Sequence, residues 1–357
     1  MIKKIAIRAC VLLFWCALIF GVLYWPEEAF LSNGRSINIF VWGDILEPTV
    51  IAEFERKTGI KVNMNFYASN EEMLVKLKAT GGHGYDLIIP SDYSVEILIK
   101  EGLVKALDKS KLNFYSKLNP KLLNHFFDPG NVYSIPFEWE VFLIGIDKEY
   151  FADKPYDPSW NMLFDLDRIS YYMTMMNDPI QMIHLASFYL YSDLPQVNKT
   201  QLHEIVSLLT KQKKYVNAYA DFRGDYFLAT KNSAAIVASS SYLWRTMKKF
   251  PFVGYVMPKE GSVITIENIA IPKPSKKEDL TYQLINHLYT RQSMKTHYDT
   301  FSIFPATTDV LPDLEGDSET LQLLSLEGEE FKTLRFTVVV ADQEQIRDAW
   351  VQVKTNY

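Results

Sequence analysis

The feature that most constrains this chain is an alternation of strand and helix patterns that repeats between residues 37 and 102. Runs rich in β-branched and aromatic residues at 37–41, 60–67 and 85–90 are each followed by an amphipathic segment. The segments at 48–57, 69–78 and 95–101 have helical spacing, and Gly59, Gly81 and Gly102 follow them. This alternation predicts an α/β fold with a mainly parallel sheet and helices on both of its faces.

Two of the predicted strands end in residues suited to holding a ligand. Trp42 and Asp44 follow the first strand, and Ser91 and Tyr93 follow the third. Because ligands of α/β sheets bind outside the carboxyl ends of the strands, we expect these side chains to share one rim of the sheet. Trp42 fits either the flat floor of a ligand site or a buried core position, since tryptophan is mostly buried in proteins.

The later chain carries further strand and helix patterns of weaker regularity. An apolar run at 141–146, reached through residues 133–139, predicts a strand that crosses from one lobe to another. The other patterns predict strands at 234–238 and 264–271, helices at 180–191, 201–215, 280–291 and 346–354, a turn at 303–306 and an exposed acidic stretch at 309–330.

Composition and motifs exclude several classes of function. The 357 residues give room for two domains, and the net charge of −6 with a pI of 5.6 argues against a nucleic-acid partner. The chain has none of the common catalytic or nucleotide-binding motifs, and its six histidines are scattered. The only cysteines, Cys10 and Cys16, lie in the first 25 residues. We therefore expect no catalytic residues, no metal site and no cofactor.

The first 25 residues differ from the rest of the chain. Lys3, Lys4 and Arg8 precede an uncharged apolar run at 9–25, which is typical of a secretory signal or an N-terminal membrane anchor. Bulky residues near Trp25 leave no small-residue cleavage site, so an uncleaved tether is favoured. The basic start predicts that the remainder lies outside the cytoplasm, in the periplasm, with residues 26–36 as a linker.

Several stretches of the chain resemble the spermidine/putrescine-binding proteins of bacterial ABC transporters. The similarity is carried by Phe40-Val41-Trp42, residues 54–62, Ser69-Asn70-Glu71, residues 85–91, residues 107–112 and residues 133–137. It continues in residues 258–261 and 269–272, covers most of 37–310 and is strongest up to residue 147. Each stretch alone is a weak indication, but together they are specific to the family.

The resemblance implies the two-lobed, type II fold of periplasmic binding proteins. Each lobe would be a mixed sheet flanked by helices, and the ligand would lie in a cleft that closes on it like a hinge. Lobe 1 would comprise 37–137 plus 268–308, and lobe 2 would comprise 138–267 plus 309–357. The implied function is that of a monomer that binds a polyamine and delivers it to the transmembrane permease subunits of an ABC importer.

The candidate ligand-binding residues follow from the strand ends and from this resemblance. In the family's pocket, aromatic rings enclose the methylene chain of a polyamine, and carboxylates meet its ammonium groups, which need such partners when they leave water. The candidates in this chain are Trp42, Asp44, Ser91, Tyr93, Trp139, Asp178, Gln181, Glu267 and Phe304.

Some positions depart from the family's pattern. Ala238 and Thr265 stand where the family has two further tryptophans, and Gln181 stands where it has a second carboxylate. Glu138 and Glu140 could supply acid from a new direction, or they could lie on the surface.

Simpler roles and other functions stay open beside these predictions. Asp178, which precedes Pro179, also fits a helix N-cap, and Glu267 also fits the solvated face of a strand. Tyr93 and Phe304 also fit core positions. The same fold could bind another small organic cation, or it could serve a membrane-tethered sensor or interaction protein that no longer binds polyamine.

Overall fold

The computed structural model describes residues 13–15, 35–220, 223–315 and 332–355. The predicted signal or anchor at 1–25, apart from 13–15, lies outside the described residues, as do the linker up to residue 34 and most of the acidic stretch at 309–330. Within the described ranges, no helix combines the length and the apolar character needed to cross a bilayer.

The first third of the body forms the predicted alternating unit. Its elements are β1 (Ser36–Trp42), α3 (Pro48–Thr58), β2 (Lys61–Tyr67), α4 (Asn70–Thr80), β3 (Leu87–Ile88) and α5 (Asp92–Lys100). β1 is parallel to both of its neighbours, β2 and β3. Gly59 follows α3 with φ 70°, a conformation that glycine adopts without steric cost, and the Ser69 hydroxyl accepts a hydrogen bond from the Glu72 N–H at the start of α4. The observed order of strands and helices confirms the prediction, and these local contacts explain where the helices begin and end.

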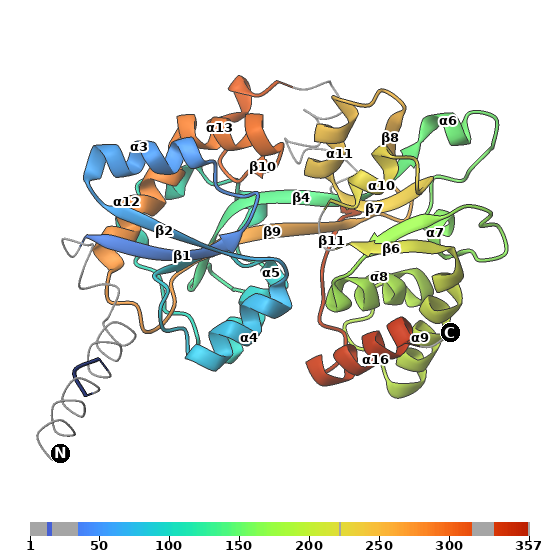
Figure 1. Cartoon of the computed structure of the whole chain (residues 1–357), viewed down its shortest axis with the longest axis horizontal. Coiled ribbons are helices and arrows are strands. Elements are labelled where there is room, and N and C mark those ends of the chain that lie inside the picture. Colours follow the sequence, from blue (N-terminus) through green and yellow to red (C-terminus); the bar gives the residue numbers. More distant parts are fainter. Residues whose placement is uncertain (1–12, 16–34, 221–222, 316–331, 356–357) are drawn as a thin grey trace, which may run out of the picture.

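Two antiparallel strands at the centre, β4 (Ser134–Asp147) and β9 (Val263–Ala270), connect the two halves of the molecule (Figure 1). The strand order is β2-β1-β3-β9-β4-β7-β5-β6, where β5 is Met173–Met176, β6 is Val216–Ala220 and β7 is Ala235–Ser239. In this order β9 pairs antiparallel with β3, and β4 pairs antiparallel with β7. The sheet is therefore mixed and not mainly parallel. The prediction of a mainly parallel sheet holds for the first third, where strand and helix alternate, and parallel pairs recur in the second half, where β5 pairs with β6 and β7.

The second half is built around the C-terminal part of β4. Its elements up to β8 are α6 (Lys148–Phe151), α7 (Asn161–Phe164), β5 (Met173–Met176), α8 (Pro179–Tyr191), α9 (Lys199–Gln212), β6 (Val216–Ala220), α10 (Asp225–Ala229), β7 (Ala235–Ser239), α11 (Ser240–Met247) and β8 (Val253–Val256). After β9 the chain returns to the first half with α12 (Glu278–Leu288), α13 (Arg291–Phe301) and β10 (Phe304–Pro305), and then continues with β11 (Arg335–Phe336) and α16 (Gln343–Thr355). α16 packs against α8 and α9.

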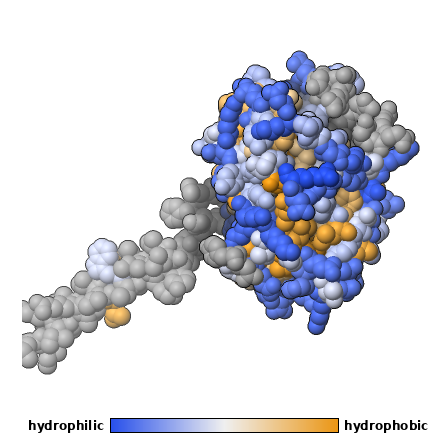
Figure 2. Space-filling view, turned by 90° about the vertical axis from the view of Figure 1, so that its right-hand side faces the viewer, coloured by the Kyte–Doolittle hydropathy of each residue, from blue (hydrophilic) through white to orange (hydrophobic). Residues whose placement is uncertain are grey.

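A hydrophobic core lies on each face of the sheet, because side chains along a strand alternate between its faces. In β1, Ile37, Ile39 and Val41 enter one core, while Phe40 enters the other. Helices cover both sides in Figure 1, with α3 and α13 above the strands of the left half and α4 and α5 below them. On the face at the right of Figure 1, hydrophilic residues predominate and one group of apolar residues lies near the centre (Figure 2).

Some elements differ from the sequence-based expectations. The helix predicted at 280–291 is confirmed as α12, which ends at Leu288, whereas the sequence patterns do not predict α13. The predicted turn at 303–306 contains the short strand β10. β10 exists because it pairs with β4, which is a long-range contact. The lobe boundaries stay predictions; β4 runs through the one proposed between residues 137 and 138.

Candidate functional site

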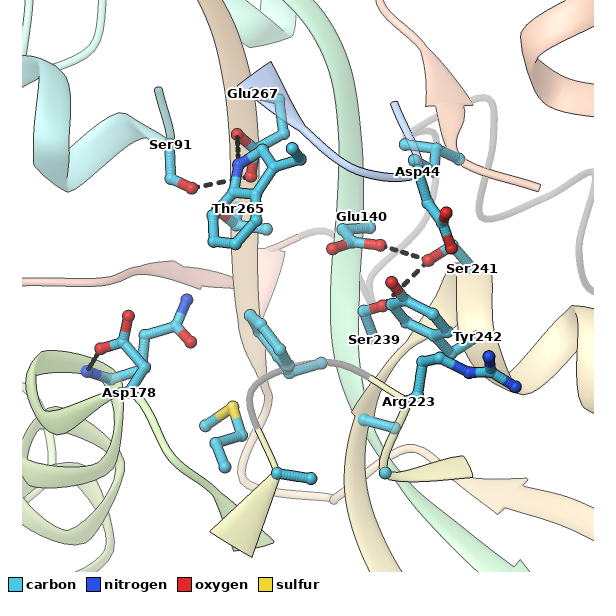
Figure 3. Close-up of a pocket in the computed structure, with 18 of the residues that line it drawn as sticks. Asp44, Ser91, Glu140, Asp178, Arg223, Ser239, Ser241, Tyr242, Thr265 and Glu267 are labelled. Carbon is cyan, nitrogen blue, oxygen red and sulfur yellow. Dashed lines mark hydrogen bonds between the residues drawn. The ribbon is translucent and has the colours of Figure 1, made fainter. Parts of the chain in front are cut away.

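A cavity of about 120 Å³ lies where the two halves meet. Its lining comes from the end of β1, the starts of α5 and α8, the middles of β4 and β9, the end of β7 and the start of α11 (Figure 3). The charged lining residues are Asp44, Glu140, Asp178, Glu267, Arg223 and Arg245. Trp42, Phe142 and Tyr242 supply aromatic surface. The cavity therefore combines carboxylates with aromatic rings at a strand-end rim.

Trp42, Ser91 and Glu267 form one side of the cavity, which we name the Glu267 wall. The indole Nε1–H of Trp42 donates to Glu267 Oε2 at 3.0 Å, and the Ser91 hydroxyl donates to Oε1 at 2.7 Å (Figure 3). Burial raises the pKa of Glu267 to about 8, while the hydrogen bonds from Ser91 and Trp42 oppose that rise. Both carboxylate oxygens are thus held in place in a largely buried group, which is 7% exposed.

Asp178 is linked to this wall through a hydrogen-bond network. Its Oδ1 accepts from the Gln181 N–H at 2.8 Å, which makes Asp178 the N-cap of α8, and its Oδ2 accepts from the Tyr93 hydroxyl. The Asn70 amide donates to Tyr93 at 2.7 Å and to Ser91 at 3.1 Å. Asp178 is therefore both a helix cap and a cavity residue, so the two roles left open by the sequence do not exclude each other.

Glu140, Ser239 and Ser241 form another side of the cavity, which we name the Glu140 wall. The Ser241 hydroxyl donates to Glu140 Oε2 at 2.6 Å, and Ser239 Oγ lies 2.9 Å from Ser241 Oγ (Figure 3). Burial raises the pKa of Glu140. This rise is opposed by hydrogen bonds from Ser241 and Ser239 and by the positive charge of Arg245. Arg245 itself forms an ion pair with Asp44 at 3.5 Å and lies 4.4 Å above the Tyr242 ring.

Six of the predicted residues line this cavity: Trp42, Asp44, Ser91, Asp178, Gln181 and Glu267. Tyr93 lies behind the lining, fully buried, where it bonds to Asp178. Whether each of these residues contacts a ligand stays a prediction.

Trp139 and Phe304 are located in the core instead of on the cavity lining. Their rings are 4.7 Å apart and 1% and 0% exposed. Neighbouring residues on a strand point to opposite faces of the sheet. Because the Glu140 side chain faces the cavity, the Trp139 side chain faces away from it. Phe304 lies beside Trp139 in the core because β10 pairs with β4, which puts these two residues opposite each other. The predicted contacts of these two rings with a ligand therefore have no support in the structure.

The two glutamates beside Trp139 have different environments. Glu140 lines the cavity, whereas Glu138 is 1% exposed and its Oε1 lies 3.6 Å from His297 Nδ1. Burial raises the pKa of Glu138 and lowers that of His297 to about 3. Only one of the two acids is therefore available to a ligand in this cavity.

The sequence-based candidates lack the lining residues Ser239, Ser241, Tyr242 and Arg245, and they include Glu140 only as an alternative to a surface position. The sequence does contain an indication of this part of the site. The three serines at 239–241 follow a predicted strand, as Ser91 does, and strand ends are where ligands bind in α/β sheets. The departures from the family's pattern, Ala238, Thr265 and Gln181, do line the cavity. In the parts of the chain that the structure describes, His, Cys, Asp and Glu side chains nowhere gather in threes as a metal site requires.

The mixed two-lobed fold and its interlobe cavity define a solute-binding protein. The sequence profile described as "Bacterial extracellular solute-binding protein" matches residues 49–322, and the chain therefore belongs to that family.

Individual relatives are similar along most of their length. The chain is 29% identical over 304 residues to the putrescine/cadaverine-binding protein of Pseudomonas aeruginosa, which covers 82% of this chain and 85% of that one. It is 32% identical over 270 residues to the spermidine/putrescine-binding periplasmic protein of Escherichia coli, with 73% and 75% covered. A solved spermidine/putrescine ABC transporter substrate-binding protein from Streptococcus pneumoniae superimposes with a TM-score of 0.74 at 26% identity, covering 90% of this chain and 99% of that one.

Proposed function

We propose that this protein is the extracytoplasmic substrate-binding component of an ABC importer and that it binds a polyamine in the cavity between its halves. The observation that carries the proposal is the Glu267 wall, where a buried carboxylate is fixed by an indole and a hydroxyl. The names of the relatives, which are binding proteins for putrescine, cadaverine or spermidine, support the same ligand class.

The chemistry of the cavity suits a cationic amine. An ammonium group is strongly hydrated, so it leaves water only where a carboxylate replaces its water ligands. Glu267 and Asp178 offer that replacement, and Trp42 adds an aromatic surface for a methylene chain or a cation–π contact of about 0.5–2 kcal/mol. Binding and release are the whole task of such a site, so we expect no chemical turnover of the ligand.

Titration calorimetry with putrescine, cadaverine and spermidine tests the proposal. We expect saturable binding of at least one amine, weakened in Asp178→Asn and in Glu267→Gln. Glu96→Gln makes the same kind of change at a surface glutamate that pairs with Lys100, and it should leave the affinity unchanged. A folded protein that binds none of the amines contradicts the proposal and favours a sensor or interaction role.

A second candidate is another small organic cation in the same cavity. Ala238, Thr265 and Gln181 favour it, because they give less aromatic surface and one carboxylate fewer than the family's pocket, as the resemblance implies. Binding of a monocationic amine that is tighter than binding of every polyamine would support this candidate.

We further propose that residues 1–25 keep the protein at the outer face of the inner membrane, where it delivers its ligand to permease subunits. The basic start and the apolar run support this location, as does the word "periplasmic" in the name of the Escherichia coli relative. Protease added to spheroplasts should digest the body of the protein. A body that stays protected until the membrane is lysed contradicts export.

A further inference from the structure

The Glu140 wall contains a carboxylate that neither the family resemblance nor the relatives assign to ligand binding. Glu140 lies on β4, and its Oε2 accepts a hydrogen bond of 2.6 Å from Ser241, which in turn contacts Ser239. Ser239 is the last residue of β7 and Ser241 lies in the first turn of α11, so the junction of this strand and helix positions the carboxylate. A carboxylate has about four lone-pair sites, so the bond from Ser241 leaves it able to accept further donors.

Among the described residues, no cation forms an ion pair with Glu140. Arg245 is the cation that acts on it most closely, but the ion pair that Arg245 makes is with Asp44, at 3.5 Å. The two serines are neutral donors, which stabilise an anion without cancelling its charge. Glu140 also raises the pKa of Glu267, so the two carboxylates are close enough to interact, and a cation between them would relieve their repulsion.

The lining of the cavity has a formal charge that matches two ammonium groups. Four carboxylates and two guanidinium groups leave a formal charge of −2. Gln181, at the position of a family carboxylate, supplies none of this charge. In Figure 3, Glu267 and Glu140 approach the cavity from different strands, with Asp178 at the start of α8.

We propose that Glu140 is a second ammonium-binding carboxylate, so that the cavity holds an α,ω-diamine with one ammonium at the Glu267 wall and the other at the Glu140 wall. This inference rests on the proposed function and adds to it the residue that fixes the far end of the ligand. Ser239 and Ser241 act as positioning residues, because they hold the Glu140 carboxylate.

This assignment is tested by measuring how a substitution in the protein and a change in the ligand, alone and together, affect the binding affinity. Putrescine is compared with 4-amino-1-butanol, which replaces one ammonium with a neutral hydroxyl, in the full-length protein and in Glu140→Gln. We expect Glu140→Gln to weaken putrescine binding by about tenfold or more, since a hydrogen bond to a charged group is worth about 1.5–3 kcal/mol. The amino alcohol should change by less than about threefold, because its single ammonium occupies the Glu267 wall.

Equal effects on both ligands, or no effect on putrescine, would overturn the assignment of Glu140. If Glu267→Gln still weakens both ligands in that case, the proposed function stands and only the inference fails. If neither ligand binds the unaltered protein, both fail. Should Glu140→Gln prevent folding, Ser241→Ala, which removes the positioning hydrogen bond, takes its place in the same cycle and should selectively weaken putrescine.

Discussion

The Glu267 wall and the Glu140 wall both bring a carboxylate to the cavity, but the protein holds the two groups differently. Both carboxylate oxygens of Glu267 accept hydrogen bonds, one from Trp42 at the end of β1 and the other from Ser91, which follows β3. Glu140 is held at one oxygen by Ser241, and Ala238, where the resemblance implies a tryptophan in the family, lines the same cavity. The comparison indicates that the first wall fixes its carboxylate at both oxygens, while the second leaves its carboxylate able to accept further donors.

The largest effect that separates the walls is expected from Glu267→Gln. The change removes the charge that meets an ammonium and also disturbs two hydrogen bonds, so putrescine affinity should fall by about 10- to 100-fold, or about 1.5–3 kcal/mol. Titration calorimetry at pH 7.5 measures it. A loss smaller than that of Glu140→Gln would reverse the ranking of the two walls.

The next effect concerns pH, because burial raises the pKa of Glu267 to about 8. Below pH 8 the free protein carries a proton on Glu267, and an ammonium requires the ionised form, so binding must release that proton. Putrescine affinity should therefore rise with pH, by up to about tenfold per unit between pH 6 and 8, and level off above pH 8. The Glu140 carboxyl, whose pKa is also raised, contributes in the same direction.

Calorimetry at pH 7 in two buffers of different ionisation enthalpy counts the protons exchanged. We expect net proton release, reduced in Glu267→Gln. A flat pH profile or proton uptake would show that the buried carboxyl is not the group that meets the cation.

A smaller effect is expected from Gln181→Glu, which adds a carboxylate to the cavity and changes its formal charge from −2 to −3. Spermidine carries one positive charge more than putrescine, so its affinity should rise by about tenfold relative to that of putrescine. Competition between the two amines measures the ratio. Gln181→Met, which is similar in size and uncharged, is the control; a gain in that variant would mean that charge is not the cause.

The smallest effect is expected from Tyr93→Phe. It removes the hydroxyl that joins Asp178 to Asn70 but keeps the buried ring, so the loss should be about 1 kcal/mol, or roughly fivefold in affinity. Titration calorimetry with putrescine is again the measurement. A loss as large as that of Glu267→Gln would mean that Tyr93 contacts the ligand itself.

The sequence predicted the first third of the fold well, because its signals are local. Gly59 ends a helix and Ser69 begins one through contacts a few residues away. Trp42 and Ser91 are recognisable from the sequence as strand ends, but Glu267 lies 225 residues from its partner Trp42, and only the family resemblance indicates it. Nothing local indicates such a contact, since it depends on the pairing of β9 with its neighbours.

Positions that depend on strand pairing were predicted less well. Trp139 and Glu140 are adjacent, and which of them faces the cavity is decided by the register of β4 against β9, where Glu140 pairs with Thr265. The helix at 291–301 has a polar sequence, and its apolar side becomes apparent only when Met294, Tyr298 and Phe301 pack on the core. Sequence patterns give the order of elements, whereas side-chain orientation at the site comes from long-range pairing.

A crystal structure of the full-length protein grown with putrescine tests the central claim most directly. We expect one diamine in the cavity, with one nitrogen about 2.7–2.9 Å from a Glu267 oxygen and the other at a similar distance from a Glu140 oxygen. A diamine bound elsewhere, or one that touches neither carboxylate, would contradict the account.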